Sequence, residues 1–494
     1  MTMPTIDTLI CNAYIITIDE HRRVFTNGYL AISDGRISAI GSMRDCPAPV
    51  NADGRRVEVI DAGGRLLMPG MVNGHNHLIQ NSFRGYNDDR WPVLDIPAAV
   101  RRLIEQLFAL SGRLDDERTY ALVRLHALEM LKLGYTATHD EHFTNVRKDS
   151  VDGSWQALAD SGMRGYLCRC IVDGAGVPVE GHEAIDDGLA EVERLKAKFD
   201  GERIRVATGF LNFNFVSDPE HMRRIHQGAR ALGVAFDVDM TDNSRGAVLA
   251  QRGFEHGQVR YYESFGLLDE PIYAGKAVQV RPDEFDLLKA YDCRLALVPA
   301  LRFFDAVGLP IHEFFSRDMI PGLGTDAPLV SDCQSPFETM RLAIFAQNLA
   351  VKNSVAAGGE RPDAAHWAVA ERTLEMATLG GARTLFIDDV SGSLQVGKAA
   401  DCVLVDTQRS DFAPDHAGRR KVGSLVWAGH AGMVDSVWIA GERLIEGGKS
   451  TRWDEETVVA EAEAVLADID REVDLGRFLS PRQAGSSFRG WNYV

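Results

Sequence analysis

The chain has 494 residues, enough for one large domain with a smaller one, or for two to three ordinary domains. Its 53 Lys and Arg stand against 71 Asp and Glu, a formal net charge of −18, which argues against nucleic acid or an anionic membrane as partner. No signal-peptide pattern opens the chain, no apolar run reaches about 18 residues, and the seven cysteines form no C-x-x-C pair. We therefore expect a cytoplasmic protein without a membrane segment.

The first 65 residues predict a small β-rich unit. D-T-L-I-C-N-A-Y-I-I-T-I-D (7–19) and G-Y-L-A-I-S-D-G-R-I-S-A-I-G (28–41) alternate in the manner of strands, and an Asp34-Gly35 turn divides the second run. Strands of the same kind recur at 400–406 and 436–445. Because a short β-unit leaves sheet edges uncovered, we expect residues 1–65 and 389–450 to build one composite β-sandwich.

Between these segments, short apolar runs alternate with helical stretches. The first run is 66–72, and seven more follow at 136–140, 165–172, 205–211, 235–240, 272–280, 295–299 and 320–326. The helical stretch 114–133 shows the expected end signals, with acidic residues in its first turn and Lys132 and Gly134 at its end. Eight strands with helical crossovers predict an α/β fold, a (β/α)8 TIM barrel over 66–388. Residues 451–494 are predicted as a C-terminal helix and tail.

The candidate site consists of polar residues where the predicted strands end, because barrel enzymes carry their active residues at the C-terminal face. After the first strand comes G-H-N-H-L, in which His75 and His77 lie on one side of extended chain and can bind one metal ion. The later strands contribute carboxylates and a lysine: Asp239 and Asp242 after the fifth, Lys276 in the sixth and Asp326 at the end of the eighth.

The chain resembles the amidohydrolase superfamily over almost its whole length. Three motifs carry the resemblance: P-G-M-V-N-G-H-N-H (69–77), G-L-G-T-D (322–326) and G-S-L-Q-V-G-K-A-A-D (392–401). The branch it resembles most is that of the s-triazine hydrolases and nucleobase deaminases. The resemblance implies a hydrolase that acts on a non-peptide C–N bond, or a similar leaving group, of a small and cyclic compound. It also implies a homodimer or homotetramer.

In that branch, one divalent metal is bound by the H-x-H pair, a strand-5 histidine and the strand-8 aspartate, while a glutamate and a strand-6 histidine transfer protons. His75, His77 and Asp326 match this pattern. The other three positions depart from it, with Asp239 for the strand-5 histidine, Asp242 for the glutamate and Lys276 for the strand-6 histidine.

Two interpretations of this altered centre remain open. In the first, His75, His77, Asp239 and Asp326 bind one zinc, iron or manganese ion, and Lys276 replaces the proton-transferring histidine. In the second, the site is metal-free, and the Lys276 ammonium lies between Asp239 and Asp326 in place of the lost cation.

Three hypotheses about function follow. In a hydrolase, Lys276 and Asp326 orient or deprotonate the attacking water, and Asp242 protonates the leaving nitrogen. In a metal-free lyase or isomerase, Lys276 forms a Schiff base while Asp239 and Asp326 carry protons, although two acids would keep that lysine charged. A non-catalytic pseudoenzyme scaffold is the third, because half of the usual positions are replaced. The intact remaining motifs favour the hydrolase.

Residues around the barrel mouth are expected to contact a small-molecule substrate. The segment 139–142 follows the second strand, and an arginine after the seventh strand can bind a substrate carboxylate in a bidentate pair. The predicted contacts are Arg302, Glu141, His142, Phe83, Arg84 and Trp91. The sequence does not identify the substrate itself.

Overall fold

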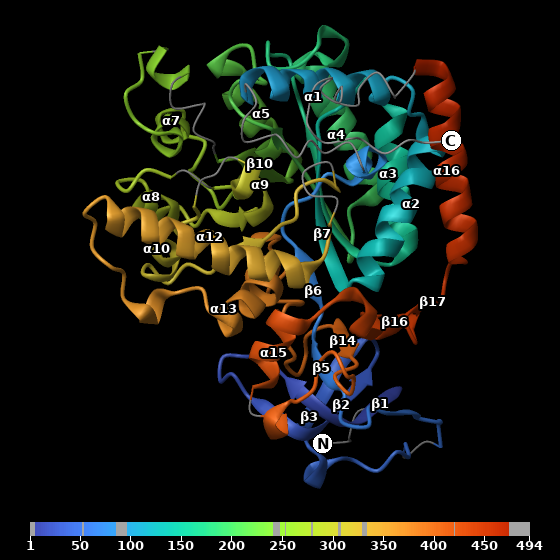
Figure 1. Cartoon of the computed structure of the whole chain (residues 1–494). Coiled ribbons are helices and arrows are strands. Elements are labelled where there is room, and N and C mark those ends of the chain that lie inside the picture. The colour runs from blue at the N-terminus through green and yellow to red at the C-terminus, as the bar shows by residue number, and fades with distance from the viewer. Residues whose placement is uncertain are drawn as a thin grey trace, which may run out of the picture.

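The computed structural model describes residues 5–51, 54–84, 96–240, 248–251, 253–277, 280–304, 308–328, 333–418 and 420–473. Within these ranges the strands form two sheets, one of nine strands and one of eight. The nine-stranded sheet occupies the end of the molecule that holds the N-terminus, and the eight-stranded barrel with its helices makes up the larger part (Figure 1). The predicted fold class is thus confirmed.

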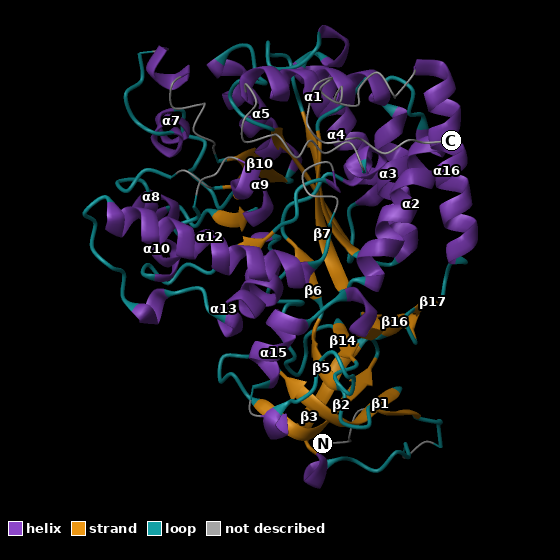
Figure 2. Ribbon diagram, in the orientation of Figure 1, coloured by secondary structure: helices purple, strands orange, loops and turns teal. Residues whose placement is uncertain are grey.

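Strands from both ends of the chain build the nine-stranded sheet (Figure 2). Their bounds are β1 (Thr8–Ile16), β2 (Val24–Ser33), β3 (Arg36–Ser42), β4 (Glu58–Asp61), β5 (Leu66–Pro69), β14 (Cys402–Val405), β15 (Val434–Ile439), β16 (Glu442–Glu446) and β17 (Lys449–Ser450). The order is β17-β16-β15-β14-β5-β1-β2-β3, with β4 paired to β1. β5 joins the strands from the N-terminal part of the chain to those from the C-terminal part, because it pairs in parallel with β1 and antiparallel with β14.

The barrel strands pair in parallel and in chain order. They are β6 (Met71–Asn73), β7 (Tyr135–His142), β8 (Arg164–Cys170), β9 (Ile204–Phe210), β10 (Ala235–Asp239), β11 (Tyr273–Lys276), β12 (Arg294–Leu297) and β13 (Gly322–Leu323). The first and last strands meet where the Gly74 N–H donates to the Leu323 carbonyl at 2.8 Å and where Asn76 forms a bridge with Asp326. The strand ends that follow β6 and β13 are therefore neighbours.

Several predicted strand limits are wrong, and Asp326, predicted at the end of the eighth strand, lies three residues beyond β13. The run 66–72 is divided between the sheets: Leu66–Pro69 is β5 of the nine-stranded sheet, and Met71–Asn73 is β6 of the barrel. The predicted strand 272–280 ends at Lys276, so this lysine is its last residue rather than its centre. The segment 139–142 belongs to β7 and does not follow it.

Helices surround the barrel (Figure 1). Their bounds are α1 (Ile96–Ser111), α2 (Asp116–Lys132), α3 (Asp149–Ser161), α4 (Ile185–Phe199), α5 (Pro219–Leu232), α7 (Gln258–Ser264), α8 (Phe285–Ala290), α9 (Pro299–Phe304), α10 (Ile311–Phe315), α12 (Pro336–Ala356), α13 (Ala370–Glu375), α14 (Gly381–Thr384), α15 (Lys421–Ala428) and α16 (Glu455–Val473). Among the described residues, no helix has the length and apolar character needed to cross a membrane.

Ion pairs connect distant parts of the chain. The C-terminal helix α16 lies along α2 (Figure 1), where Lys132 Nζ is 2.5 Å from Glu455 Oε1. Between the two sheets, Arg164 of β8 donates from Nε to Asp401 Oδ2 at 2.6 Å and from Nη2 to Oδ1 at 3.2 Å. Both of the latter side chains are buried, so this bidentate pair fixes the barrel to the strand β14 that follows Asp401.

Candidate active site

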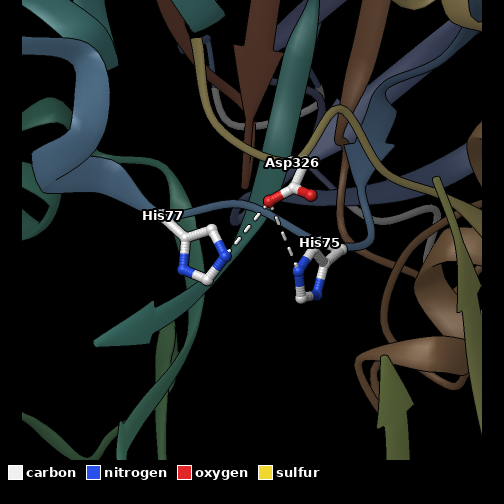
Figure 3. A group of neighbouring side chains, drawn as sticks. All are labelled: His75, His77 and Asp326. Atoms are coloured by element: carbon white, nitrogen blue, oxygen red, sulfur yellow. Dashed lines mark ion pairs between the residues drawn. The ribbon is translucent and has the colours of Figure 1, made fainter. Parts of the chain in front are cut away.

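His75 and His77 follow β6, and both imidazoles are buried on the same side of the chain (Figure 3). Their ring centroids are 5.1 Å apart. Asn76, between them, extends the other way, and its Nδ2 lies 3.0 Å from His126 Nε2. Because side chains alternate along the extended H-N-H segment, the two imidazoles point to one centre and the Asn76 side chain points into the core.

The hydrogen bonds of the outer ring nitrogens determine which nitrogen faces the centre. His77 Nδ1 lies 2.7 Å from the Glu141 carbonyl oxygen, which can only accept. His75 Nδ1 lies 2.7 Å from the Tyr273 hydroxyl, whose one proton goes to the Gly74 carbonyl at 2.8 Å. Both Nδ1 atoms are therefore assigned a proton, and both rings turn Nε2 toward the centre. This is the orientation in which a histidine binds a metal ion through Nε2.

Carboxylates lie against these two Nε2 atoms. Asp326 Oδ1 is 3.1 Å from His77 Nε2 and 3.8 Å from His75 Nε2 (Figure 3). Glu141 Oε2 is 3.7 Å and 3.9 Å from the same two nitrogens. Burial and the nearby Lys276 ammonium hold the pKa of His75 well below its usual value, so this ring is neutral. The His75 Nε2 lone pair has no hydrogen-bond partner among the described residues, and it is repelled by a buried carboxylate unless a cation lies between them.

Several buried acceptors in the centre have no hydrogen-bond partner within the described ranges: His75 Nε2, both carboxylate oxygens of Glu141 and Oδ1 of Asp239. Buried polar atoms are normally paired, and leaving them unpaired is unfavourable. Two sets of residues bring such atoms within 4.8 Å of one another, His75 with His77 and Asp326, and His75 with Glu141 and Asp239. Imidazole and carboxylate ligands suit zinc, iron and manganese, so the donor set fits one of these ions.

Lys276 supplies a positive charge at the same centre. Its Nζ lies 2.9 Å from Asp239 Oδ2 and 3.9 Å from Asp326 Oδ2. Burial opposes the charged form of this lysine, but the surrounding carboxylates outweigh it and raise the pKa of Lys276 above its ordinary value. Although burial acts in the opposite direction, the same ammonium group helps to lower the pKa of Asp326. The lysine is therefore a cation, as expected from its two acidic neighbours.

The backbone at Lys276 is strained. Its φ is 62°, and the N–H of Ala277 donates to the Gly275 carbonyl at 2.7 Å, which together describe a γ-turn of the rare classic type. Asp326 also has a positive φ, 59°. Gly275 leaves room for the centre, because a Cβ there would lie 2.3 Å from Asp239 Oδ1. Strain of this kind is concentrated at functional sites.

Behind His75 lie two residues that the sequence analysis did not single out, Tyr273 and Asp237, together with His139, which it named only as part of the segment 139–142. The Tyr273 ring stacks on His139 at 4.2 Å, and His139 Nε2 lies 2.8 Å from Asp237 Oδ2. Burial lowers the pKa of His139 to about 3 and raises that of Asp237. The spacing of D-V-D was a usable signal, because a period of two puts Asp237 on the same face of β10 as Asp239.

The predicted substrate contacts are distributed differently. Glu141 lies beside the two imidazoles, whereas His142 extends from the opposite face of β7, with its Nδ1 3.9 Å from Asp140 Oδ2. Phe83 is buried in η2 (Leu78–Phe83), and Arg84 Nη2 contacts Glu129 Oε2 of α2 at 2.5 Å. Three further predictions fall outside what the structure describes: Asp242, Trp91 and the side chain of Arg302.

The fold and the site define a class. A parallel (β/α)8 barrel with imidazoles, carboxylates and a lysine converging beyond its carboxyl strand ends has the architecture of a barrel hydrolase. The chain belongs to the amidohydrolase family, whose profile matches residues 66–444. At the level of this family, the predicted resemblance and the predicted class, a hydrolase for non-peptide C–N bonds, are confirmed.

Known proteins are similar over nearly the whole chain. A 5-methylthioadenosine/S-adenosylhomocysteine deaminase of Pelotomaculum thermopropionicum is 28% identical over 466 residues, covering 94% of this chain and 99% of the relative. A 5′-deoxyadenosine deaminase of Methanobrevibacter smithii is 25% identical over 462 residues, covering 93% and 98%. The structure of an adenosine deaminase from Xanthomonas campestris with bound zinc has 24% identity and a TM-score of 0.78, covering 95% and 100%. Atrazine chlorohydrolase from Arthrobacter aurescens, complexed with zinc, has 21% identity and a TM-score of 0.80, covering 93% and 100%.

Proposed function

We propose that this protein is a metal-dependent hydrolase that replaces the exocyclic amino group of a small nitrogen heterocycle by oxygen from water. The adenine ring of a 5′-substituted nucleoside is the proposed substrate class, supported by the deaminases to which the chain is similar. One observation carries the proposal. The Nε2 atoms of His75 and His77 and the carboxyl groups of Glu141 and Asp326 converge in a buried centre.

The charges of the centre support a bound cation. Three carboxyl groups, those of Glu141, Asp239 and Asp326, surround the single ammonium of Lys276. Burial and the neighbouring Asp239 charge raise the pKa of Glu141 well above its usual value, so a cation would be needed to keep all three ionised. A divalent metal ion would compensate the two negative charges that Lys276 leaves, and it would supply Lewis-acid activation of water. His75, His77 and Asp326 would hold this ion together with one further carboxylate.

In this proposal, Lys276 and Asp326 handle protons. Water adds to the ring carbon that carries the amino group, and Asp326 accepts its proton. Electron density then rises on the adjacent ring nitrogen, where the Lys276 ammonium donates a hydrogen bond. The C–N bond breaks as the leaving nitrogen takes up a proton and departs as ammonia. Asp242 stays the predicted donor of that last proton, and Arg302 and Trp91 stay predicted substrate contacts.

The geometry gives less support to the other hypotheses. A Schiff-base lyase or isomerase needs a neutral amine, whereas Lys276 is held in its charged form. The metal-free interpretation, with Lys276 between Asp239 and Asp326, agrees with the distances of 2.9 and 3.9 Å. It offers no partner to His75 Nε2 or to the Glu141 oxygens, which the described residues leave unpaired. The metal centre accounts for both observations.

Metal analysis combined with an ammonia assay tests the proposal. Protein purified without chelators or a metal-binding tag is expected to contain about one equivalent of zinc, iron or manganese by elemental mass spectrometry. A His75→Ala/His77→Ala double variant should contain none. The loaded protein should release ammonia from 5′-methylthioadenosine, 5′-deoxyadenosine or another aminated heterocycle in a panel. Wild-type protein that neither retains nor takes up any of the three metals, or that turns over substrate without one, would refute the proposal.

A further inference from the structure

We infer that Glu141 of β7, and not Asp239 of β10, is the carboxylate that completes the metal centre. Asp239 is then the counter-ion of Lys276. The inference rests on the proposed function, because it concerns the same bound ion, and it assigns to Glu141 a role other than the predicted substrate contact.

The distances favour Glu141. In a tetrahedral zinc site with ligand atoms about 2.0–2.1 Å from the ion, the ligand atoms lie roughly 3.3 Å from one another. Glu141 Oε2 is 3.7 Å from His77 Nε2 and 3.9 Å from His75 Nε2, similar to the 3.1 and 3.8 Å of Asp326 Oδ1. A carboxylate oxygen of Asp239 also lies within 4.8 Å of His75 and Glu141, but among the described ion pairs Asp239 has one with Lys276 and none within 4.0 Å of either imidazole.

The backbone of Glu141 is bonded to the segment that carries the imidazoles. Its N–H donates to the Asn76 carbonyl at 3.0 Å, and its carbonyl oxygen accepts from His77 Nδ1 at 2.7 Å. A shift of β7 would therefore move the two histidines with it. This coupling keeps the Glu141 carboxylate in register with both Nε2 atoms, as a metal ligand requires.

The charges lead to the same assignment. The Glu141 side chain is fully buried, and neither of its oxygens has a hydrogen-bond partner among the described residues. Asp239 is equally buried but already has the ammonium of Lys276 at 2.9 Å. If Asp239 bound the ion, Glu141 would be left without a cation among the described residues. Pairing the ion with Glu141 and the ammonium with Asp239 leaves neither of these two carboxylates without one.

Two isosteric amide variants separate the two carboxylates. Glu141→Gln and Asp239→Asn each remove one negative charge from the same buried centre, so each serves as the control for the other. Zinc affinity is measured by competition with a chromogenic chelator, and the visible spectrum of the Co²⁺-loaded proteins reports the ligand set. Glu141→Gln should weaken zinc binding by about 100-fold or more and change the Co²⁺ spectrum, since loss of a ligand exceeds the 10–100-fold effect of an outer partner. Asp239→Asn should keep the wild-type spectrum and stay within about tenfold in affinity.

The inference would be overturned if Asp239→Asn weakened zinc binding more than Glu141→Gln did, or if both variants lost the same zinc affinity. Wild-type protein that binds neither zinc nor Co²⁺ would instead refute the proposed function itself. If Glu141→Gln does not fold, Glu141→His provides the second variant, because an imidazole can occupy the ligand position. It should bind zinc with an altered Co²⁺ spectrum, and an unaltered spectrum would contradict the role of Glu141.

Discussion

Removing one hydroxyl group tests how His75 is oriented. Tyr273→Phe deletes the acceptor 2.7 Å from His75 Nδ1 and the donor 2.8 Å from the Gly74 carbonyl, while the aromatic ring stays. Without that acceptor, nothing fixes the proton on Nδ1 and the lone pair on Nε2. We expect metal affinity to fall by 10- to 100-fold, the usual effect of losing an outer partner of a ligating histidine. This corresponds to about 1.4–2.7 kcal/mol of binding free energy.

The metal-free protein should also lose stability. The variant leaves the His75 N–H and the Gly74 carbonyl buried and unpaired, and each such group costs about 1–3 kcal/mol. Metal affinity is measured by chelator competition, and the free energy of unfolding by urea titration of the metal-free protein. The two measurements separate ligand orientation from packing, because a purely structural effect would lower the free energy of unfolding and leave metal affinity unchanged.

Tyr166→Phe is the matched control for Tyr273→Phe. The two rings stack with centroids 5.5 Å apart inside the barrel, and the Tyr166 hydroxyl is buried without a hydrogen-bond partner in the described part of the chain. Its removal should leave metal affinity unchanged and stability equal or higher. Equal metal affinities of the two variants would refute the assignment of the His75 tautomer.

Other parts of the structure give three further predictions. Gly275→Ala places a Cβ 2.3 Å from Asp239 Oδ1, so it should lower the free energy of unfolding in urea titrations by about 1–3 kcal/mol and weaken metal binding. Gly423→Ala is its control, because no atom lies within 4 Å of the added Cβ, and it should have neither effect. Burial lowers the pKa of His126 from 6.5 to about 3, so its contribution to stability is complete above pH 6.5 and is lost as the pH falls toward 3, by about 1.4 kcal/mol per pH unit. His126→Gln should reduce the slope of unfolding free energy against pH by that amount, and an unchanged slope would contradict this. Arg164→Met leaves the buried Asp401 without its partner and should cost about 3–5 kcal/mol of unfolding free energy, while an Arg164→Met/Asp401→Leu double variant should recover part of it.

The fold could be predicted because its signals are local. Alternating strands and helix end signals each depend on a few neighbouring residues, and their order along the chain specifies a barrel. The division of the run 66–72 was missed, although its Pro69-Gly70 pair is a break signal, because the other residues are apolar and periodicity contains no boundary. Pairing partners decide it: β5 pairs with β14 and β6 with β7, so the boundary is a tertiary property.

The site could be predicted in part for the same reason. The H-N-H segment and the terminal Asp326 are motifs in sequence, and the pairing of Lys276 with two aspartates followed from their strand ends. The stack of Tyr273 on His139 joins β11 with β7, strands that are not adjacent in the barrel. Such contacts depend on which side chains cross the barrel interior, and no spacing along the chain contains that information.

The replaced positions make sense as one exchange of charge. The resemblance implies histidines where this chain has Asp239 and Lys276, and the carboxylate and ammonium that replace them lie 2.9 Å apart. Either substitution alone would bury an unpaired charge, which is strongly unfavourable. The pair therefore leaves the net charge of the centre as it was but also removes an imidazole ligand. In the metal centre inferred above, Glu141, whose oxygens have no hydrogen-bond partner among the described residues, takes the place of that ligand.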